Sequence, residues 1–243
     1  MSQHRRLKIL HTNDLHGQLT PARLEVLLSL RKDADLYFDT GDIIKAGNLA
    51  IPLKKDPAWE FLHQTNITAS TLGNRETHIL ASAFEAKLAG ADHPILVANM
   101  RDRTGAPGKW RESMIVESGG LKIGIFGVMV PMVTKRMKTQ ATSRYLWRDP
   151  IAAAEEVVAK LRPEVDVVFA LTHIGFGQDK KLADQVPGID VIFGGHSHTV
   201  LEKPELIDST AIVQGGSHGR FIGSYVWEEG SGLVEAELIP WAP

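Results

Sequence analysis

The chain has 243 residues, of which 43% are hydrophobic and 23% charged, and its formal net charge at pH 7 is −2. These values are ordinary for a globular protein with a substantial core, and such a charge gives no long-range attraction toward nucleic acid or an anionic membrane. The chain contains no cysteine, which excludes disulfides, thiolate metal ligands and a cysteine nucleophile. Any metal ion must therefore be held by nitrogen and oxygen atoms.

No apolar stretch is long enough for a signal peptide or a membrane span. The apolar run that follows the basic N-terminal residues extends only from Leu7 to Leu10. The apolar region of a signal peptide needs roughly 7–15 residues. The longest apolar stretch, Ile123 to Val133, is broken by Gly127 and Pro131 and is shorter than the roughly 20 residues that cross a bilayer. We therefore expect a cytoplasmic protein with neither a membrane nor a nucleic-acid partner. The sequence leaves the oligomeric state open.

Apolar runs with strand-like and helix-like periods alternate along most of the chain. The expected strands are Leu7–Thr12, Leu36–Asp39, Ile67–Leu72, Ile95–Val97, Ser113–Glu117 with Leu121–Val128 as a hairpin, Val165–Leu171, Val191–Phe193, Ala211–Val213, Phe221–Trp227 and Val234–Ile239. The expected helices are Pro21–Leu30, Pro57–Gln64, Ile79–Leu88 and Pro150–Leu161, with Asp149 as an N-cap of the last. Segments 101–111 and 132–148 are expected to be irregular. This order predicts an α/β fold of two mixed sheets flanked by helices, in a single domain of residues 1–243.

Candidate metal ligands follow five of the predicted strands, at the point where each strand ends. They are Asp14, His16, Asp42, Asn74, His173, His196 and His198. In an open α/β sheet, ligands bind outside the carboxyl ends of the strands. Carboxylate oxygen and imidazole nitrogen suit divalent ions such as manganese, iron or zinc. Seven candidates suffice for two ions if one carboxylate bridges them.

A pair of divalent ions predicts a particular chemistry. Two ions roughly 3.5–4 Å apart can hold a phosphate ester and lower the pKa of a bridging water. Asn74 would bind a metal without adding negative charge that repels the phosphate. The pattern therefore predicts hydrolysis of small phosphate esters by a metal-bridging hydroxide. We expect Mn²⁺ as the ion, with Fe, Zn or Mg as alternatives.

In their order along the chain, the motifs Asp-x-His, Gly-Asp, Gly-Asn-x-Glu, Thr-His and Gly-His-Ser-His resemble those of the calcineurin-like metallophosphoesterases. The string from Ile9 to Gly17 is similar to that of the 5′-nucleotidase branch, and the resemblance covers the catalytic domain only. It implies a four-layer αββα sandwich. It also implies that Asp42 bridges one metal held by Asp14, His16 and His198 and another held by Asn74, His173 and His196.

The chain departs from the family pattern at two positions. The family usually has a histidine where Arg75 stands, and its nucleotidase branch has an aspartate where His78 stands. Arginine is a poor proton donor but can bind phosphate oxygens bidentately. We therefore expect Arg75 to bind substrate and stabilise charge in the transition state, and His78, one helical turn on, to supply the proton. Asn99, after another predicted strand, is a further candidate for binding substrate.

Two other functions stay open at this point. One is a phosphodiesterase, including one for cyclic nucleotides, because a good leaving group lessens the need for a general acid. The other is a catalytically weak, metal-binding scaffold. Nucleotides as substrates are implied by the resemblance alone. We expect Glu76 to lie at a helix N-terminus and His218 to lie in a solvated turn.

Overall fold

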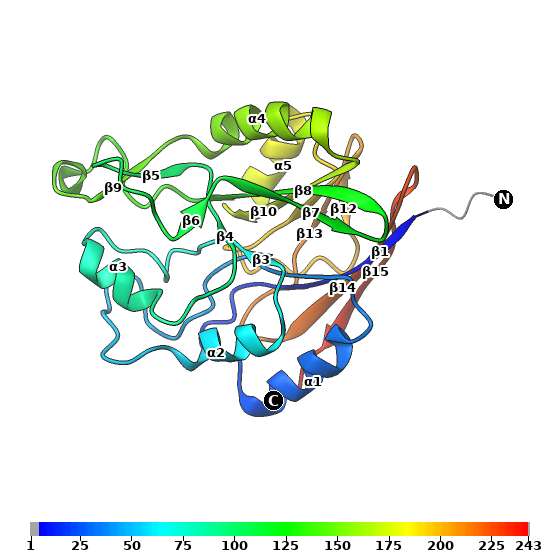
Figure 1. Ribbon diagram of the computed structural model, residues 1–243, viewed down its shortest axis with the longest axis horizontal. Helices are drawn as coiled ribbons and strands as arrows, with labels where there is room; N and C mark the ends of the chain where they lie inside the picture. The colour runs from blue at the N-terminus through cyan, green and yellow to red at the C-terminus, as the bar shows by residue number, and fades with distance from the viewer. Residues whose placement is uncertain (1–4, 243) are drawn as a thin grey trace.

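The computed structural model describes residues 5–242 and contains two β-sheets that pack face to face (Figure 1). The seven-stranded sheet has, in spatial order, β15 (Gly232–Pro240), β14 (Phe221–Glu228), β1 (Arg6–Thr12), β2 (Leu36–Asp39), β3 (Ala69–Ser70), β4 (Ile95–Leu96) and β6 (Trp110–Arg111). The six-stranded sheet has β12 (Glu205–Ile207), β13 (Thr210–Val213), β11 (Val191–Phe193), β10 (Val167–His173), β8 (Leu121–Met129) and β7 (Ser113–Ser118). A small two-stranded sheet pairs β5 (Met100–Asp102) with β9 (Tyr145–Trp147).

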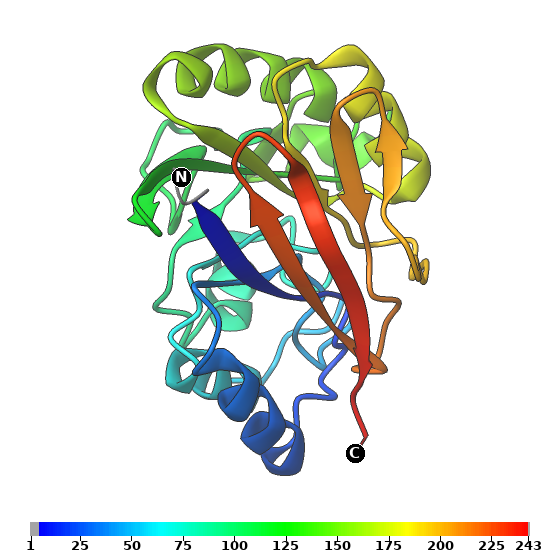
Figure 2. The same cartoon turned by 90° about the vertical axis from the view of Figure 1, so that its right-hand side faces the viewer.

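Helices cover the outer face of each large sheet, as Figures 1 and 2 show. On the side of the seven-stranded sheet lie α1 (Pro21–Arg31), α2 (Pro57–Gln64) and α3 (Ala81–Lys87). On the side of the six-stranded sheet lie α4 (Pro150–Leu161) and α5 (Phe176–Gln185). Short 3-10 turns occur at Lys138–Ala141 and Arg162–Glu164. Within residues 5–242, no helix combines the length and apolar character that crossing a membrane requires.

Three apolar clusters fill the spaces between the four layers, and strand β10 shows how. Val167, Phe169 and Leu171 face the other sheet, whereas Val168 and Ala170 face α4 and α5. Because successive side chains of a strand point to opposite faces, a strand covered on both sides needs apolar residues at every position. The continuous apolar run of β10 therefore follows from its place in the interior. The observed layers confirm the expected αββα sandwich.

The predicted helices that begin with proline are confirmed. Helix α4 has the expected bounds, and the Asp149 side chain accepts hydrogen bonds from the main-chain N–H groups of Ile151 and Ala152, both at 3.0 Å. Helix α2 also has the expected bounds, with Asp56 as its cap. Proline suits the first turn of a helix because the N–H that it lacks would have no partner there.

The sequence interpretation missed helix α5 and several short strands. Only Leu182, Ala183 and Asp179 of α5 are buried, so its apolar period is too weak to identify a helix. The segments predicted to be irregular contain β5, β6 and β9. The predicted helix from Ile79 begins instead at Ala81, and residues 74–76 form a turn. His78 therefore does not lie one helical turn beyond Arg75.

Asn99 links the two large sheets through hydrogen bonds to main-chain groups. Its side chain is fully buried, its Nδ2 donates to the carbonyl of Met129 at 2.7 Å, and its Oδ1 accepts from the Met129 N–H at 3.0 Å. Nδ2 also donates to the Arg148 carbonyl at 3.3 Å. Because both ends of the amide are used, this placement counts against the expected contact between Asn99 and substrate.

Replacing Asn99 with alanine tests this structural role. The variant leaves two main-chain groups of Met129 buried without partners, and each such group costs about 1–3 kcal/mol. We expect N99A to lower the free energy of unfolding by about 2–6 kcal/mol in a urea titration, with KM unchanged at temperatures where it is folded. The exposed Gln178→Ala serves as the control, with an expected change within about 0.5 kcal/mol. A raised KM with unchanged stability would instead support substrate binding.

Candidate metal centre

The seven candidate ligands lie at one edge of the two packed sheets. Strands β1, β2 and β3 are parallel to one another, as are β10 and β11, so their carboxyl ends meet at this edge. The loops after these strands carry every candidate except His173, which is the last residue of β10. The fold thus brings together side chains that are as far apart in the chain as Asp14 and His198.

One group of ligands gathers around the Asp14 carboxylate, which is fully buried. Its Oδ1 lies 3.3 Å from His198 Nε2 and 3.7 Å from His16 Nε2. The two histidine Nε2 atoms are 3.1 Å apart, and His16 Nε2 lies 3.9 Å from Asp42 Oδ2. These atoms belong to the residues that the resemblance assigns to one metal ion.

A second group gathers around the Asn74 amide oxygen. Asn74 Oδ1 lies 3.2 Å from His173 Nε2 and 3.0 Å from His196 Nδ1. His173 Nε2 also lies 3.7 Å from Asp42 Oδ1. Asp42 therefore presents Oδ2 to the first group and Oδ1 to the second, which is the arrangement that a bridging carboxylate requires.

The main chain fixes the ring of His173 so that its Nε2 faces the second group. His173 Nδ1 lies 2.6 Å from the Thr40 carbonyl, which can only accept, so Nδ1 carries the ring proton. With the ring proton on Nδ1, Nε2 can present a lone pair to a cation held beside Asn74 and Asp42. A cation satisfies such converging acceptors, and the nitrogen and oxygen donor set suits a divalent ion.

Asp14 shows the same need for a cation in the first group. Its Oδ2 accepts hydrogen bonds from the His196 N–H at 2.9 Å and from Asn13 Nδ2 at 2.7 Å. Its Oδ1 is buried and has no hydrogen-bond partner, although it faces His16 and His198. A buried acceptor without a partner is costly, so the residues fit a bound metal ion.

The charges around Asp14 favour its ionised form. Burial by itself would raise the pKa of this carboxyl, but the imidazoles of His16 and His198 and the nearby His173 hold the pKa well below its usual range. The same contact with Asp14 raises the pKa of His198, whereas burial lowers the pKa of His196. The carboxylate is thus available as an anionic ligand.

Five of the seven candidates have a left-handed backbone, which residues other than glycine rarely adopt. The φ angles are +50° at Asp14, +52° at His16, +55° at Asp42, +75° at His196 and +55° at His198. Such conformations cost of order 1–3 kcal/mol each and concentrate at functional sites. Main-chain hydrogen bonds between the loops after β1 and β2 hold Asp14, His16 and Asp42 in this conformation. They run from the Asp14 N–H to the Gly41 carbonyl at 2.9 Å and from the His16 N–H to the Asp42 carbonyl at 2.8 Å.

Glu76 holds the Asp42 loop, a role that the sequence interpretation missed. It lies in a turn and not at a helix N-terminus, and its carboxylate is fully buried. Its oxygens accept hydrogen bonds from the main-chain N–H groups of Asp42, Ile43 and Gly73, each at 2.8 Å, and of Ile44 at 3.1 Å. The glutamate of the Gly-Asn-x-Glu motif was the available signal.

Arg75 lies beside the Asp42 carboxylate, and 26% of its side chain is exposed. Its main-chain N–H donates to Asp42 Oδ1 at 2.7 Å, and its Nε lies 4.0 Å from Asp42 Oδ2. His78 is partly exposed, and its Nδ1 accepts a hydrogen bond from the Leu80 N–H at 3.1 Å. In residues 5–242, no hydrogen bond or ion pair joins His78 to a candidate ligand, and its role stays a prediction.

His218 lies against the first group of ligands, although we expected a solvated turn. The turn is exposed, but the His218 ring stacks on His16 with centroids 4.5 Å apart and planes at 8°. Its main-chain N–H donates to the Asp14 carbonyl at 2.7 Å. Nitrogen atoms of His16, His198 and His218 all lie within 4.8 Å of one another. His218 thus borders the metal centre.

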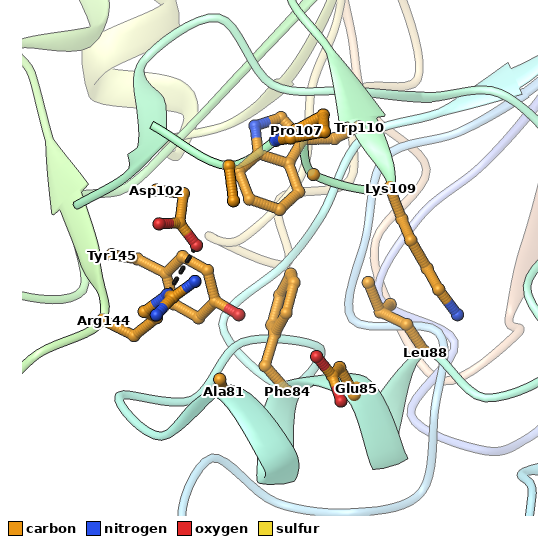
Figure 3. Close-up of a pocket in the computed structure, with 12 residues that line it drawn as sticks. Ala81, Phe84, Glu85, Leu88, Asp102, Pro107, Lys109, Trp110, Arg144 and Tyr145 are labelled. Atoms are coloured by element: carbon orange, nitrogen blue, oxygen red, sulfur yellow. Dashed lines mark hydrogen bonds and ion pairs between the residues drawn. The ribbon is translucent and has the colours of Figure 1, made fainter. Parts of the chain in front are cut away.

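A separate pocket of about 400 Å³ lies between α3 and the loop before β6 (Figure 3). The rings of Phe84, Trp110 and Tyr145 line it and contact one another, with centroids 4.7–5.7 Å apart. Asp102 and Arg144 form an ion pair in its wall. None of the seven candidate ligands lines this pocket, so it is distinct from the metal centre.

Comparisons with known proteins agree on one family. A family model described as calcineurin-like phosphoesterase matches residues 7–200. A 5′-nucleotidase from Vibrio vulnificus is 25% identical over 288 residues, which cover 97% of this chain and 51% of the relative. An apyrase from Tabanus yao is 32% identical over 267 residues, with 90% and 47% covered. The chain spans about half the length of these curated relatives.

The fold is also found in solved structures. The crystal structure of a 5′-nucleotidase precursor from Thermus thermophilus aligns with a TM-score of 0.80 at 24% identity, covering 97% of this chain and 54% of that one. This likeness confirms the fold.

Glu76→Gln tests how the Asp42 loop is held. Glutamine keeps one acceptor oxygen and turns an NH₂ group toward two main-chain N–H donors, so about two charge-assisted hydrogen bonds are lost at about 1.5–3 kcal/mol each. We expect E76Q to lower the free energy of unfolding by at least about 3 kcal/mol in a denaturant titration. Glu85→Gln, an exposed change on α3, is the matched control. Equal stability of the two variants would contradict this role.

Proposed function

The chain belongs to the calcineurin-like phosphoesterase family, and on that premise we propose that it hydrolyses small phosphate esters with two divalent metal ions that share Asp42. Family membership and the 5′-nucleotidase relatives make it a metal-dependent phosphoric ester hydrolase. The dinuclear centre, the ligand set and the substrate class are the proposal. We also propose that residues 1–243 act as a single catalytic domain.

The observation that supports two ions is the orientation of the Asp42 carboxylate. One of its oxygens faces His16 and the other faces His173. Imidazole nitrogens of different loops thus approach both oxygens of this carboxylate. Such pairs of ions, when bound, activate water and neutralise the oxygens of the phosphate in an in-line displacement.

In this proposal, the residues of this chain bind the metal ions and the phosphate. Asp14, His16 and His198 hold one ion beside Asp42, and Asn74, His173 and His196 hold the other. Asn74 adds no negative charge that would repel a phosphate. The partly exposed Arg75 guanidinium lies beside Asp42, where it can bind two phosphate oxygens at once. Mn²⁺ is the proposed ion, and Fe, Zn and Mg are the alternatives because they accept the same kind of donor set.

Nucleotides are the proposed substrate class because the relatives bear the names 5′-nucleotidase and apyrase. The chain covers only about half of those proteins, so contacts with the nucleobase are not carried over. A phosphodiesterase is the second candidate, since Arg75 stands where the family has a histidine and diesters with good leaving groups need less acid catalysis.

An assay on the chelator-treated protein tests the function. We expect no turnover without metal and restored turnover with Mn²⁺. We expect Asp42→Asn to lower turnover at least about 100-fold, because its NH₂ group cannot bind a cation, so one ion loses a ligand and the other loses an anionic one. The substrates are AMP, p-nitrophenyl phosphate and bis-p-nitrophenyl phosphate. Preference for AMP supports a nucleotidase, and preference for the diester supports the second candidate. Inactivity with every metal and substrate would leave only a metal-binding scaffold.

Substitutions of Arg75 test how the leaving group departs. We expect Arg75→Ala to lower kcat/KM by about 10- to 100-fold, because a charged hydrogen bond contributes about 1.5–3 kcal/mol. Arg75→His should raise turnover of esters with poor leaving groups above that of the unaltered protein, because it restores a proton donor. His78→Ala should lower turnover of these esters if His78 supplies the proton. If Arg75→His leaves turnover of these esters at or below that of the unaltered protein, the idea of a lost acid is wrong.

A further inference from the structure

The Asn74 amide can serve the metal centre in only one of its two orientations. Its Oδ1 faces His173 Nε2 at 3.2 Å and His196 Nδ1 at 3.0 Å. If the amide rotated by half a turn, its NH₂ group would face these nitrogens, and a donor cannot bind a cation. A hydrogen bond from outside the ligand set that favours the productive orientation would therefore strengthen metal binding.

Asn48 supplies that preference from the neighbouring loop. Its Oδ1 accepts a hydrogen bond from Asn74 Nδ2 at 2.8 Å. An amide oxygen can only accept, so this contact holds the NH₂ end of Asn74 away from the histidines and turns Oδ1 toward them. Asn48 itself contacts none of the histidines through a hydrogen bond in the described part of the chain.

The loop that carries Asn48 has little apolar packing to hold it. Leu49 is 87% exposed and Leu53 is 101% exposed, so burial of these side chains contributes almost nothing to the position of the loop. Polar contacts must therefore place Asn48. They come from the buried side chain of Lys87, at the end of α3.

Lys87 joins the Asn48 loop to the turn that carries Asn74. The residue is fully buried, and its ammonium donates to the carbonyls of Gly47 at 2.8 Å, Asn48 at 3.1 Å and Arg75. An ammonium has three N–H donors, and these three acceptors use all of them. Because Arg75 follows Asn74 directly, the buried Lys87 ammonium joins both segments. It thereby keeps Asn48 close to Asn74.

We propose that Asn48 is a positioning residue that orients the Asn74 amide for metal binding, and that Lys87 holds Asn48 in place. This inference rests on the proposed metal centre. It assigns a function to two residues outside the ligand set. It also explains why a lysine is buried beside a site for cations: its charge is directed to main-chain carbonyls and not toward the metal ligands.

Calorimetric titration of the full chain with Mn²⁺ tests the proposal through affinity, without reference to turnover. Residues that orient a metal ligand typically contribute 10- to 100-fold to affinity. We expect Asn48→Ala to weaken one of two binding events about 10-fold. The folded state should be intact, since Asn48 is exposed. Leu49→Ala, the next residue and also exposed, is the matched control and should bind Mn²⁺ like the unaltered protein.

The double variant shows whether Asn48 acts through Asn74. Asn74→Ala should weaken the same binding event by more than Asn48→Ala, and adding Asn48→Ala to Asn74→Ala should then cause no further loss. Lys87→Met should weaken the same event about 10-fold or more, measured at a temperature where circular dichroism shows a folded chain.

The possible failures are distinct. If Asn48→Ala binds Mn²⁺ like Leu49→Ala, or weakens it equally in the Asn74→Ala background, the positioning role is wrong while the metal centre stands. Unchanged affinity in folded Lys87→Met would overturn the part assigned to Lys87. If Asn74→Ala itself leaves both binding events unchanged, the proposed metal centre fails, and this inference fails with it.

Discussion

The structure depends on the convergence of side-chain oxygens and imidazole nitrogens at the carboxyl edge of two packed sheets. The oxygens of Asp14, Asp42 and Asn74 face imidazole nitrogens, and the buried Asp14 Oδ1 has no hydrogen-bond partner. Without a cation this arrangement is costly, because buried acceptors lose their contacts with water. The surrounding loops therefore have to hold these side chains in place by other means.

Hydrogen bonds to main-chain groups hold these loops in place, and two buried charged side chains form many of them. Glu76 accepts N–H groups from the Asp42 loop, and Lys87 donates to carbonyls of the Asn48 loop and of Arg75. The two residues have opposite charge and bind opposite kinds of main-chain group. Together they stabilise loops whose backbone includes the left-handed residue Asp42. Such support from outside the ligand set is what a preorganised metal site needs.

Arg75 and His218 lie at the rim of the centre, and Arg75 departs from the family pattern. Arg75 replaces a histidine, and its guanidinium lies beside Asp42 with part of its surface open to solvent. His218, which stacks on His16, adds an imidazole from a turn near the end of the chain. Both side chains thus border the proposed metal centre.

The sequence determined the layers of the fold and the identity of the candidate ligands, because apolar periods report burial and because polar residues after buried strands stand out. It also gave correct bounds for α2 and α4, whose prolines and aspartate caps act within a few residues. Only the tertiary structure decided what Glu76, Asn99, His218, Lys87 and Asn48 do. Their partners lie in other segments, so no local pattern records those contacts. Periodicity is a property of neighbours in the chain, whereas the orientation of an amide depends on which distant group its ends reach.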